Sequence, residues 1–387
     1  MTGPADDLPD WLRLACVPGL GAQGQRALLA GFGLPGHIFA AGRGALAAVV
    51  GGTMADTVLS AAPHESIERA LAWAGEAGNH ILTLADADYP RRLFDIADPP
   101  PLLYVKGEPA LLSRPGIALV GARSATAAGE ANAEAFARAL AQQGLVVISG
   151  LALGIDAAAH RGALAAGGAS AGTVAVIGTG IDRIYPARNA ALAREIAASG
   201  AVVSEFPLGT PPLQHNFPRR NRLIAGLAEG VLVVEAALGS GSLITARLAT
   251  ETGREVFAIP GSIHSPLSRG CHRLIRDGAK LVETAEDVFE ELRGRLGWPA
   301  PVVTPAKGHR RRGAEPATPA EPPLQAALAL DGETARVLEA IGHDPVDLDT
   351  IAARCGLTVD ALYAILLPLE LEGRLAQLPG GRFQRIT

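Results

Sequence analysis

The sequence predicts an α/β fold, an extended Rossmann-like doubly wound parallel sheet flanked by smaller helical units. Short apolar runs bounded by glycine or polar turns occur at 116–123, 144–150, 172–180, 201–206, 230–236 and 255–261. Segments of helical composition separate them, as at 125–142, 154–166, 188–199 and 241–253. Continuous apolar strands alternating with helices are typical of a parallel sheet covered on both faces. Ligands of such sheets bind beyond the carboxyl ends of the strands, so we expect functional residues there.

Composition divides the 387 residues into four zones. We expect a helical domain at 8–90, which is rich in Ala, Leu and Gly, and the Rossmann-like domain at 91–295. Residues 296–330 are interpreted as a semi-rigid linker, because seven prolines lie between 299 and 323. Residues 331–387 predict three helices and a Pro-Gly-Gly hairpin, which is the pattern of a winged helix.

Charge and cysteine usage restrict the function classes. The formal net charge is −5, so no global basic field attracts nucleic acid, and any anion site must be local. Cys16, Cys271 and Cys355 lie far apart, which argues against a zinc site or a disulfide framework and fits a reducing cytosol. The uncharged run 163–181 holds five glycines, so we expect a helix–turn–strand passage and no membrane span. We expect a cytoplasmic protein without metal or other cofactor.

Three arginines form a local cluster in the segment FPRRNRLIAG at 217–226. Arg219, Arg220 and Arg222 surround Asn221, and no acidic residue lies between 206 and 228. One interpretation is a solvated surface turn, and the other is a socket for an anion such as a phosphate backbone. Arginine binds phosphate in a bidentate manner and stacks on bases. We therefore favour the anion socket.

The loops after the first two predicted strands carry further candidates. Arg123 follows the first strand, where Ser124 or Thr126 can cap the next helix. The second strand leads into SGLALGIDAAAH at 149–160, where Ser149, Gly150 and Gly154 suit a tight loop close to a ligand. In the same segment Asp156 and His160 share a helix face, and we favour a cap and a packed histidine over a pair of metal ligands.

Another helix start follows the fifth predicted strand, in GSGSLITA at 239–246. Gly241 and Ser242 open this helix with small residues, which suits an anion-binding N-terminus. Glu205 and Glu235 are the carboxylates just after strands, and we interpret each as a partner of an N–H group or an arginine. The match of GLGAQG at 19–24 to a dinucleotide fingerprint is weak, because no strand precedes it.

With these motifs in view, the chain resembles the DNA-processing protein A (DprA/Smf) family of bacterial proteins of natural transformation. The resemblance spans about residues 88–290, through the ordered motifs YPRRLFDIADPPPLLYVKG, ALVGAR, VISGLALGIDAAAH, GTGIDRIYPARN, SEFPLG, FPRRNRLIAGL, VVEAALGSGSLITA and AIPGSI. It implies a homodimer that binds single-stranded DNA in a basic pocket and loads the RecA recombinase. By position, the pocket would involve Arg123, Ser149, Gly150, Arg219, Arg220, Asn221, Arg222, Gly241, Ser242 and Lys280. The flanking modules would be a sterile-alpha-motif-like (SAM-like) domain at 8–90 and a winged helix at 331–387.

Two positions depart from the family pattern. Leu153 stands where the family often has a basic residue, so one phosphate contact is expected to be missing. Residues 331–387 hold nine acids against five arginines, and nothing basic lies between Cys355 and Gly373, where a recognition helix would be. Pro368 is expected to interrupt that helix. Since reading duplex DNA needs cations and base-edge donors, we predict that this domain makes protein contacts instead.

An enzyme is the rival interpretation. The sheet and its SGLALGID and EAALGSGSLITA loops are similar to nucleotide-monophosphate phosphoribohydrolases of the lysine-decarboxylase-like group. That family places its catalytic glutamate where this chain has Ile244, Thr245 and Ala246, so the catalyst is missing and we expect a binding protein without catalytic residues. A nucleotide-sensing module is a weaker third interpretation.

The anion-socket hypothesis makes a direct prediction. Replacing Arg220 and Arg222 together by alanine should weaken single-strand binding and flatten its salt dependence. If binding did not change, the basic linker residues Lys307, Arg310, Arg311 and Arg312 would be the next candidates.

Overall fold

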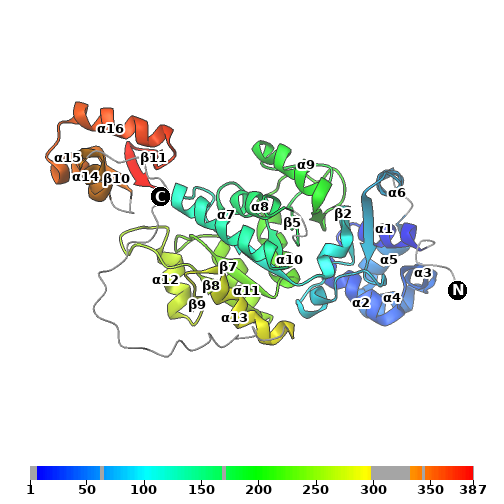
Figure 1. Ribbon diagram of the computed structural model, residues 1–387. Coiled ribbons are helices and arrows are strands. Elements are labelled where there is room, and N and C mark those ends of the chain that lie inside the picture. The colour runs from blue at the N-terminus through cyan, green and yellow to red at the C-terminus, as the bar shows by residue number, and fades with distance from the viewer. Residues whose placement is uncertain (1–6, 62–64, 168–170, 298–331, 342–344, 387) are drawn as a thin grey trace. The chain divides into compact units, whose positions relative to one another are not determined.

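The computed structural model describes residues 7–61, 65–167, 171–297, 332–341 and 345–386 (Figure 1). These residues divide into two compact units, Met1–Leu292 and Arg293–Thr387, with separate hydrophobic cores. The linker expected at 296–330 lies outside the described residues except for 296 and 297, and so do its basic residues Lys307 and 310–312.

The first unit begins with short helices. They are α1 (Leu8–Ala15), α2 (Ala22–Phe32), α3 (Pro35–Ala40), α4 (Arg43–Val50), α5 (Gly52–Ser60) and α6 (Glu65–Ala74). Gly33 and Gly51 end α2 and α4 at φ angles of 81° and 83°, where a side chain would be strained. Trp11 and Trp73 pack into one core with Tyr104 of the sheet. Helices α1 and α6 therefore share a core with the sheet, whereas Leu28, Ile38 and Leu46 belong to a second core formed by the N-terminal helices. A SAM-like domain at 8–90 stays a prediction.

One sheet organises the rest of the first unit. Its strands are β1 (Asn79–Thr83), β2 (Leu102–Gly107), β3 (Gly116–Val120), β4 (Val146–Ser149), β5 (Thr173–Val176), β6 (Ala201–Ser204), β7 (Gly230–Val233), β8 (Glu255–Ala258) and β9 (Lys280–Leu281). Their spatial order is β1-β2-β6-β5-β4-β3-β7-β8-β9, parallel from β6 to β9. The chain builds from β3 towards β6 and then crosses to β7 on the other side of β3. This reversal creates a crevice between the carboxyl ends of β3 and β7.

Helices on both faces explain the continuous apolar runs of the strands. They are α7 (Ala127–Gln142), α8 (Ile155–Leu164), α9 (Ala190–Ser199), α10 (Asn216–Leu227), α11 (Ser242–Glu251), α12 (Arg269–Arg276) and α13 (Ala285–Leu296). Val174 and Val176 belong to the core that contains Leu223 of α10, whereas Ala175 belongs to the core that contains Ile196 of α9. Successive strand residues point to opposite faces, and here both faces are buried. The predicted doubly wound fold is confirmed.

The sequence did not predict the antiparallel extension of the sheet. β1 pairs with β2 and β2 with β6, both antiparallel, although 79–83 lies inside the zone that we expected to be helical. The strand NHILT is short and begins with two polar residues, so its composition gives only a weak strand signal.

The second unit is a winged helix, as the sequence predicted. It contains α14 (Gly332–Ile341), β10 (Val346–Asp347), α15 (Leu348–Cys355), α16 (Val359–Leu371), β11 (Leu375–Leu378) and β12 (Arg382–Arg385). The expected interruption at Pro368 was wrong, because α16 continues through Pro368 to Leu371. Only the backbone bond that the Pro368 nitrogen would have donated is lost, and the buried residues Leu366 and Leu369 hold the helix on the core.

Two further predictions concern membranes and cysteines. Within the described ranges no single helix is long and apolar enough to cross a membrane, although α15 and α16 together, bent by 107°, would pass that test of length and composition. Cys16, Cys271 and Cys355 are free cysteines.

Candidate nucleic-acid interface

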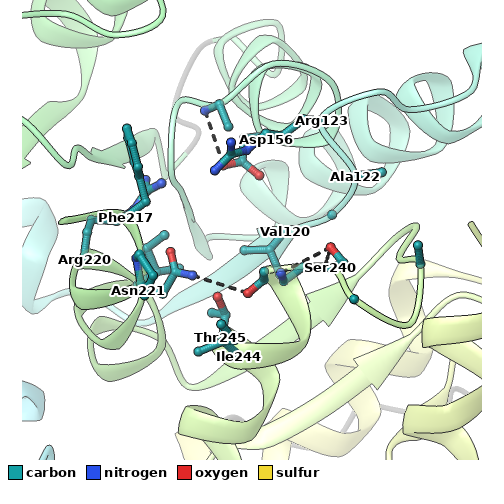
Figure 2. A pocket seen from close by; sticks show the side chains of 18 of the residues that line it. Val120, Ala122, Arg123, Asp156, Phe217, Arg220, Asn221, Ser240, Ile244 and Thr245 are labelled. Carbon is teal, nitrogen blue, oxygen red and sulfur yellow. Dashed lines mark hydrogen bonds between the residues drawn. The ribbon is translucent and has the colours of Figure 1, made fainter. Parts of the chain in front are cut away.

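A cavity of about 780 Å³ occupies the crevice between the carboxyl ends of β3 and β7 (Figure 2). The segment Val120–Ser124 after β3 forms one wall, and residues 237–242 after β7 form another. Helix α10 closes a third side with Arg220 and Asn221. The cavity therefore lies where the sheet topology places a ligand site, and segments far apart in the sequence build it.

The start of α11 supplies small polar groups to this cavity. The hydroxyls of Ser240 and Ser242 lie 2.7 Å apart, and the Ser242 N–H lies 3.3 Å from the Ser240 hydroxyl. The Asn221 amide donates to the Gly241 carbonyl at 3.4 Å, which links α10 to this loop. The N–H groups of Leu243 and Ile244 already donate to the carbonyls of Ser240 and Gly241, so the serine hydroxyls and the positive end of the helix dipole are what favour an anion here. Gly241, Ser242 and Asn221 thus lie together in the wall of the cavity.

Arg220 lies at the buried floor of the cavity. Its Nη1 atom donates to the Gly150 carbonyl at 2.5 Å and to the Val176 carbonyl, and the residue is only 4 % exposed. Burial lowers the pKa of Arg220 to about 10, while nearby Asp156 opposes that shift, so the guanidinium stays charged at neutral pH. A Cβ atom at Gly150 would overlap with the Arg220 guanidinium. Gly150 is therefore required by the arginine rather than by direct approach of a ligand.

Asp156 is the acidic residue that lines the cavity. Its Oδ2 atom accepts from the N–H groups of Gly150 at 3.1 Å and Ala152 at 3.4 Å, and so fixes the loop after β4. Burial raises the pKa of this carboxyl, while the charge of Arg220 opposes that shift. Leu151 in the same loop has a φ of 58°, which is rare for a residue other than glycine. The Asn189 amide stabilises this backbone by donating to the carbonyls of Leu151 and Ala152.

An aromatic pair and an exposed arginine form the rim. The rings of Tyr185 and Phe217 lie 5.7 Å apart between centroids, and Tyr185 is 49 % exposed. The Arg123 guanidinium carbon lies 5.6 Å from the centre of the Phe217 ring. An exposed aromatic face beside a guanidinium is the combination on which single-stranded bases stack.

The other two arginines of the cluster face away from this cavity. Both Arg219 and Arg222 donate to Oε2 of Glu205, Arg219 at 3.2 Å. Nη1 of Arg222 also donates to the Asp98 carbonyl at 2.6 Å, and its Nε lies 3.2 Å from Asp98 Oδ2. The absence of acids between 206 and 228 was thus misleading, because Glu205 lies just outside that window and Asp98 is brought in from a distant part of the sequence. Of the three clustered arginines, Arg220 alone is among the described residues that line the cavity.

Two more of the predicted site residues lie outside the cavity wall. The hydroxyl of Ser149 is fully buried and donates to the Leu119 carbonyl at 2.6 Å, so it supports the sheet. Lys280 begins β9 and forms an ion pair with Glu291. Leu153 is exposed in the loop after β4, and the missing phosphate contact there stays a prediction.

The carboxylates after strands have structural partners. Glu235 accepts from both the backbone N–H and the hydroxyl of Thr126, at 3.0 and 2.6 Å. Thr126 in turn caps α7 by accepting from the Gly129 N–H, as the sequence predicted. Ile244 and Thr245 line the cavity at the place where a phosphoribohydrolase would have its acid. No group of three or more potential metal ligands occurs within the described part of the chain.

Sequence reasoning identified Arg123 and Arg220 but missed the aromatic residues of the rim and the part that Asp156 has in the lining. Tyr185 and Phe217 were parts of quoted motifs but received no role, and Asp156 was interpreted only as a cap. Aromatic residues next to arginines after strand ends carry a usable signal, because base stacking and phosphate binding occur together.

Family comparisons agree with this architecture. Residues 80–293 match the family described as DNA recombination-mediator protein A, and residues 315–381 match the DprA winged helix domain. Protein Smf of Escherichia coli is 42 % identical over 320 residues, which cover 82 % of this chain and 81 % of that protein. The DNA processing protein DprA of Streptococcus pneumoniae is 49 % identical over 210 residues, 54 % of this chain and 73 % of that protein.

Solved structures give the same relationship. The X-ray structure of DprA from Streptococcus pneumoniae superposes with a TM-score of 0.65 at 38 % identity, covering 73 % of this chain and 97 % of that one. DprA from Helicobacter pylori, whose structure was described for its single-stranded DNA binding mode, gives a TM-score of 0.50 at 31 % identity, covering 56 % and 96 %. The expected resemblance is confirmed, and this chain belongs to the DprA/Smf family of DNA-processing proteins.

Proposed function

We propose that the chain binds single-stranded DNA in the cavity between β3 and β7, without turning it over. The observation that carries this proposal is the convergence of Arg123, Arg220 and Asn221 with the α11 start and an aromatic rim. Two guanidinium groups outweigh the single carboxylate of Asp156 in the described lining, so the cavity favours an anion. The description of the Helicobacter pylori relative as a single-stranded DNA binder supports the same ligand.

The geometry suggests separate places for phosphates and bases. A phosphate fits beside Ser240, Ser242 and Asn221, where hydroxyl and amide groups lie together at the positive end of the α11 dipole. A base fits against Tyr185 at the rim, and stacking there is tolerant of sequence because every base has a π face. We therefore expect little base preference and a strong salt dependence.

Loading of RecA onto the bound strand, assembly as a homodimer, and a cytoplasmic location belong to the same proposal. They rest on family membership.

For the dimer, two exposed apolar side chains of the first unit are candidates, Leu238 after β7 at 53 % and Ile263 after β8 at 75 % exposure. Light scattering of Ile263→Arg should report a monomer if this surface forms the dimer, and an unchanged mass would exclude it.

The arrangement of acids supports a binding protein rather than a hydrolase. Glu205 is held by arginines and Glu235 by Thr126, whereas Asp156 accepts two backbone N–H groups. Hydrolysis of a nucleotide needs an acid or base that is free to exchange a proton with substrate. We therefore expect no release of base from a nucleoside monophosphate.

Fluorescence anisotropy with labelled oligo-dT and a matched duplex, at several salt concentrations, tests the proposal. The variant is Arg123→Ala, and Arg138→Ala on α7 is the control, because Arg138 is also exposed but does not line the cavity. We expect the single strand to be preferred, and Arg123→Ala to weaken binding about tenfold and reduce the salt slope by about 0.7. Equal affinities of wild type and Arg123→Ala at every salt concentration would place the DNA site elsewhere.

A further inference from the structure

Helix α16 of the second unit presents an apolar ridge that no described residue covers. Val359, Tyr363, Leu367 and Leu371 are 42, 50, 58 and 81 % exposed. They are spaced four residues apart, and side chains at that spacing form one continuous ridge on a helix surface. Single exposed apolar residues are normal, but a row of four is a patch that marks an interaction site.

The inward face of the same helix already explains its role in folding. Leu362, Leu366 and Leu369 are buried in the core of the second unit with Ile351 and Phe383. The ridge adds nothing to that core, and exposed leucines reduce solubility. Its presence therefore requires an explanation outside the packing of this domain.

The charges around the ridge restrict what can cover it. Residues 356–373 contain Asp360, Glu370 and Glu372 and no lysine or arginine. Asp360 and Glu372 are exposed at the two ends of the helix, and among the described residues a cation lies near Glu372 alone, Arg374 at 4.0 Å. Duplex DNA is excluded as an occupant, because an acidic and apolar helix can neither neutralise phosphates nor donate to base edges.

A second copy of the ridge is also disfavoured. Two α16 helices packed in either direction would bring the acids at their ends together, and like charges facing each other across an interface cost free energy. A complementary occupant has apolar side chains that cover the ridge and lysine or arginine that faces Asp360 and Glu370. An amphipathic helix with basic flanks has this chemistry.

We propose that the α16 ridge docks a basic amphipathic helix of a partner protein. The ridge would be the surface through which the winged helix makes its predicted protein contacts. Its apolar side chains would pack against the partner, and its acids would favour a basic partner over an acidic one. Because the ridge lies in the second unit, this proposal does not depend on the DNA site of the first unit.

Two synthetic helical peptides test the proposal with the full-length protein. Both carry leucines at positions 1, 5, 8 and 12, and their remaining positions are mainly Lys in one peptide and mainly Glu in the other. Anisotropy should show the Lys peptide binding at least tenfold more tightly than the Glu peptide, and more weakly as salt rises. Leu367→Ser with Leu371→Ser should lower the affinity for the Lys peptide at least tenfold. Asp360→Asn with Glu370→Gln should lower it severalfold and bring the two peptides closer.

The control variant is Leu34→Ser with Leu59→Ser, which removes two exposed leucines of the first unit and should leave peptide binding unchanged. Circular dichroism checks folding, since substitutions at exposed positions change stability little. Equal binding of both peptides, or binding that ignores the Leu367 and Leu371 changes, overturns the proposal. So does self-association, or binding of a duplex, that the same double variant abolishes, because the ridge would then serve a second copy or DNA.

Discussion

The two faces of α10 use the same residue type for opposite purposes. On one face Arg220 and Asn221 line the cavity, and on the other Arg219 and Arg222 hold Glu205. Only the side chain of Arg219 among the three arginines is substantially exposed, at 46 %. A dense cluster of positive charge in a sequence is therefore not yet a binding site, because the fold decides which charges meet acids and which meet the ligand.

The largest expected effect is a loss of stability when Arg222 is removed from the face of α10 that holds Glu205. Arg222→Ala leaves the Glu205 carboxylate, whose side chain is 1 % exposed, without its buried partner, and should destabilise the fold by about 3–5 kcal/mol. Urea unfolding measures this change. Arg222→Met with Glu205→Met is the matched control, because replacing both charges by apolar side chains should restore most of the stability. A single variant as stable as wild type would show that the pair has no structural role.

This result also changes how the socket must be tested. The double variant Arg220→Ala with Arg222→Ala, suggested by the sequence, removes a buried ion pair and leaves the carbonyls of Gly150 and Val176 without their donor. Weak DNA binding by such a protein would reflect damage to the fold. Arg123 and Asn221 are the cleaner targets.

The second effect concerns His160, which lies behind the floor of the cavity. Burial, aided by the charge of Arg220, lowers the pKa of His160 to about 3. The unfolded state binds a proton below about pH 6.5 and the folded state does not, so stability should fall as the pH drops below 6.5. The expected loss between pH 7 and pH 5 is about 2 kcal/mol.

Urea unfolding of wild type and His160→Gln at several pH values measures this loss. The variant should be less stable at pH 7, because Thr173 loses its imidazole partner, but its stability should depend less on pH. His37→Gln removes an exposed histidine and serves as the control. Parallel pH profiles of His160→Gln and wild type would contradict the assignment.

The third effect isolates the cavity face. Asn221→Ala, next to Arg222 in the chain, should weaken oligo-dT binding about tenfold, or about 1.4 kcal/mol, because a donor beside the proposed phosphate place is lost. Its stability should change by less than about 1 kcal/mol, since its bond to Gly241 is long and exposed. Asn221→Ala would then weaken DNA binding with little loss of stability, whereas Arg222→Ala would mainly reduce stability.

The sequence predicted the fold well because strands buried on both faces have a clear apolar signature. The runs GVLVVEA and GTVAVIGTG contain the observed strands β7 and β5, although each strand is shorter than its run. The antiparallel extension was missed because β1 is short and partly polar. Pro368 misled because a proline costs one backbone bond, and tertiary packing of α16 outweighs that cost.

The site was predicted only in part, and the reason is physical. Arg123, Gly241 and Ser242 follow strand ends or open a helix, so topology brings them together, whereas Asn221 joins them from the middle of α10. Arg219, Arg222 and Ser149 lie near the same strand ends but point into other contacts. Sequence position fixes where a residue lies along an element, whereas the direction of its side chain depends on partners such as Glu205 and Asp98 that the local sequence does not reveal.

The smallest effect is expected for Arg219→Ala, and it tests most directly whether the two faces of α10 have separate roles. Arg219 pairs with Glu205, as Arg222 does, but its side chain is half-exposed and solvent screens the pair. Arg219→Ala should therefore cost at most about 1 kcal/mol of stability and leave oligo-dT affinity unchanged within about twofold. The same anisotropy and urea assays measure both quantities. A tenfold loss of affinity with an intact fold would mean that the strand runs from the cavity over the outer face of α10, past the ring of Phe206 on which Arg219 lies. The two faces of the helix would then both belong to the DNA site, and only Arg222 would be structural.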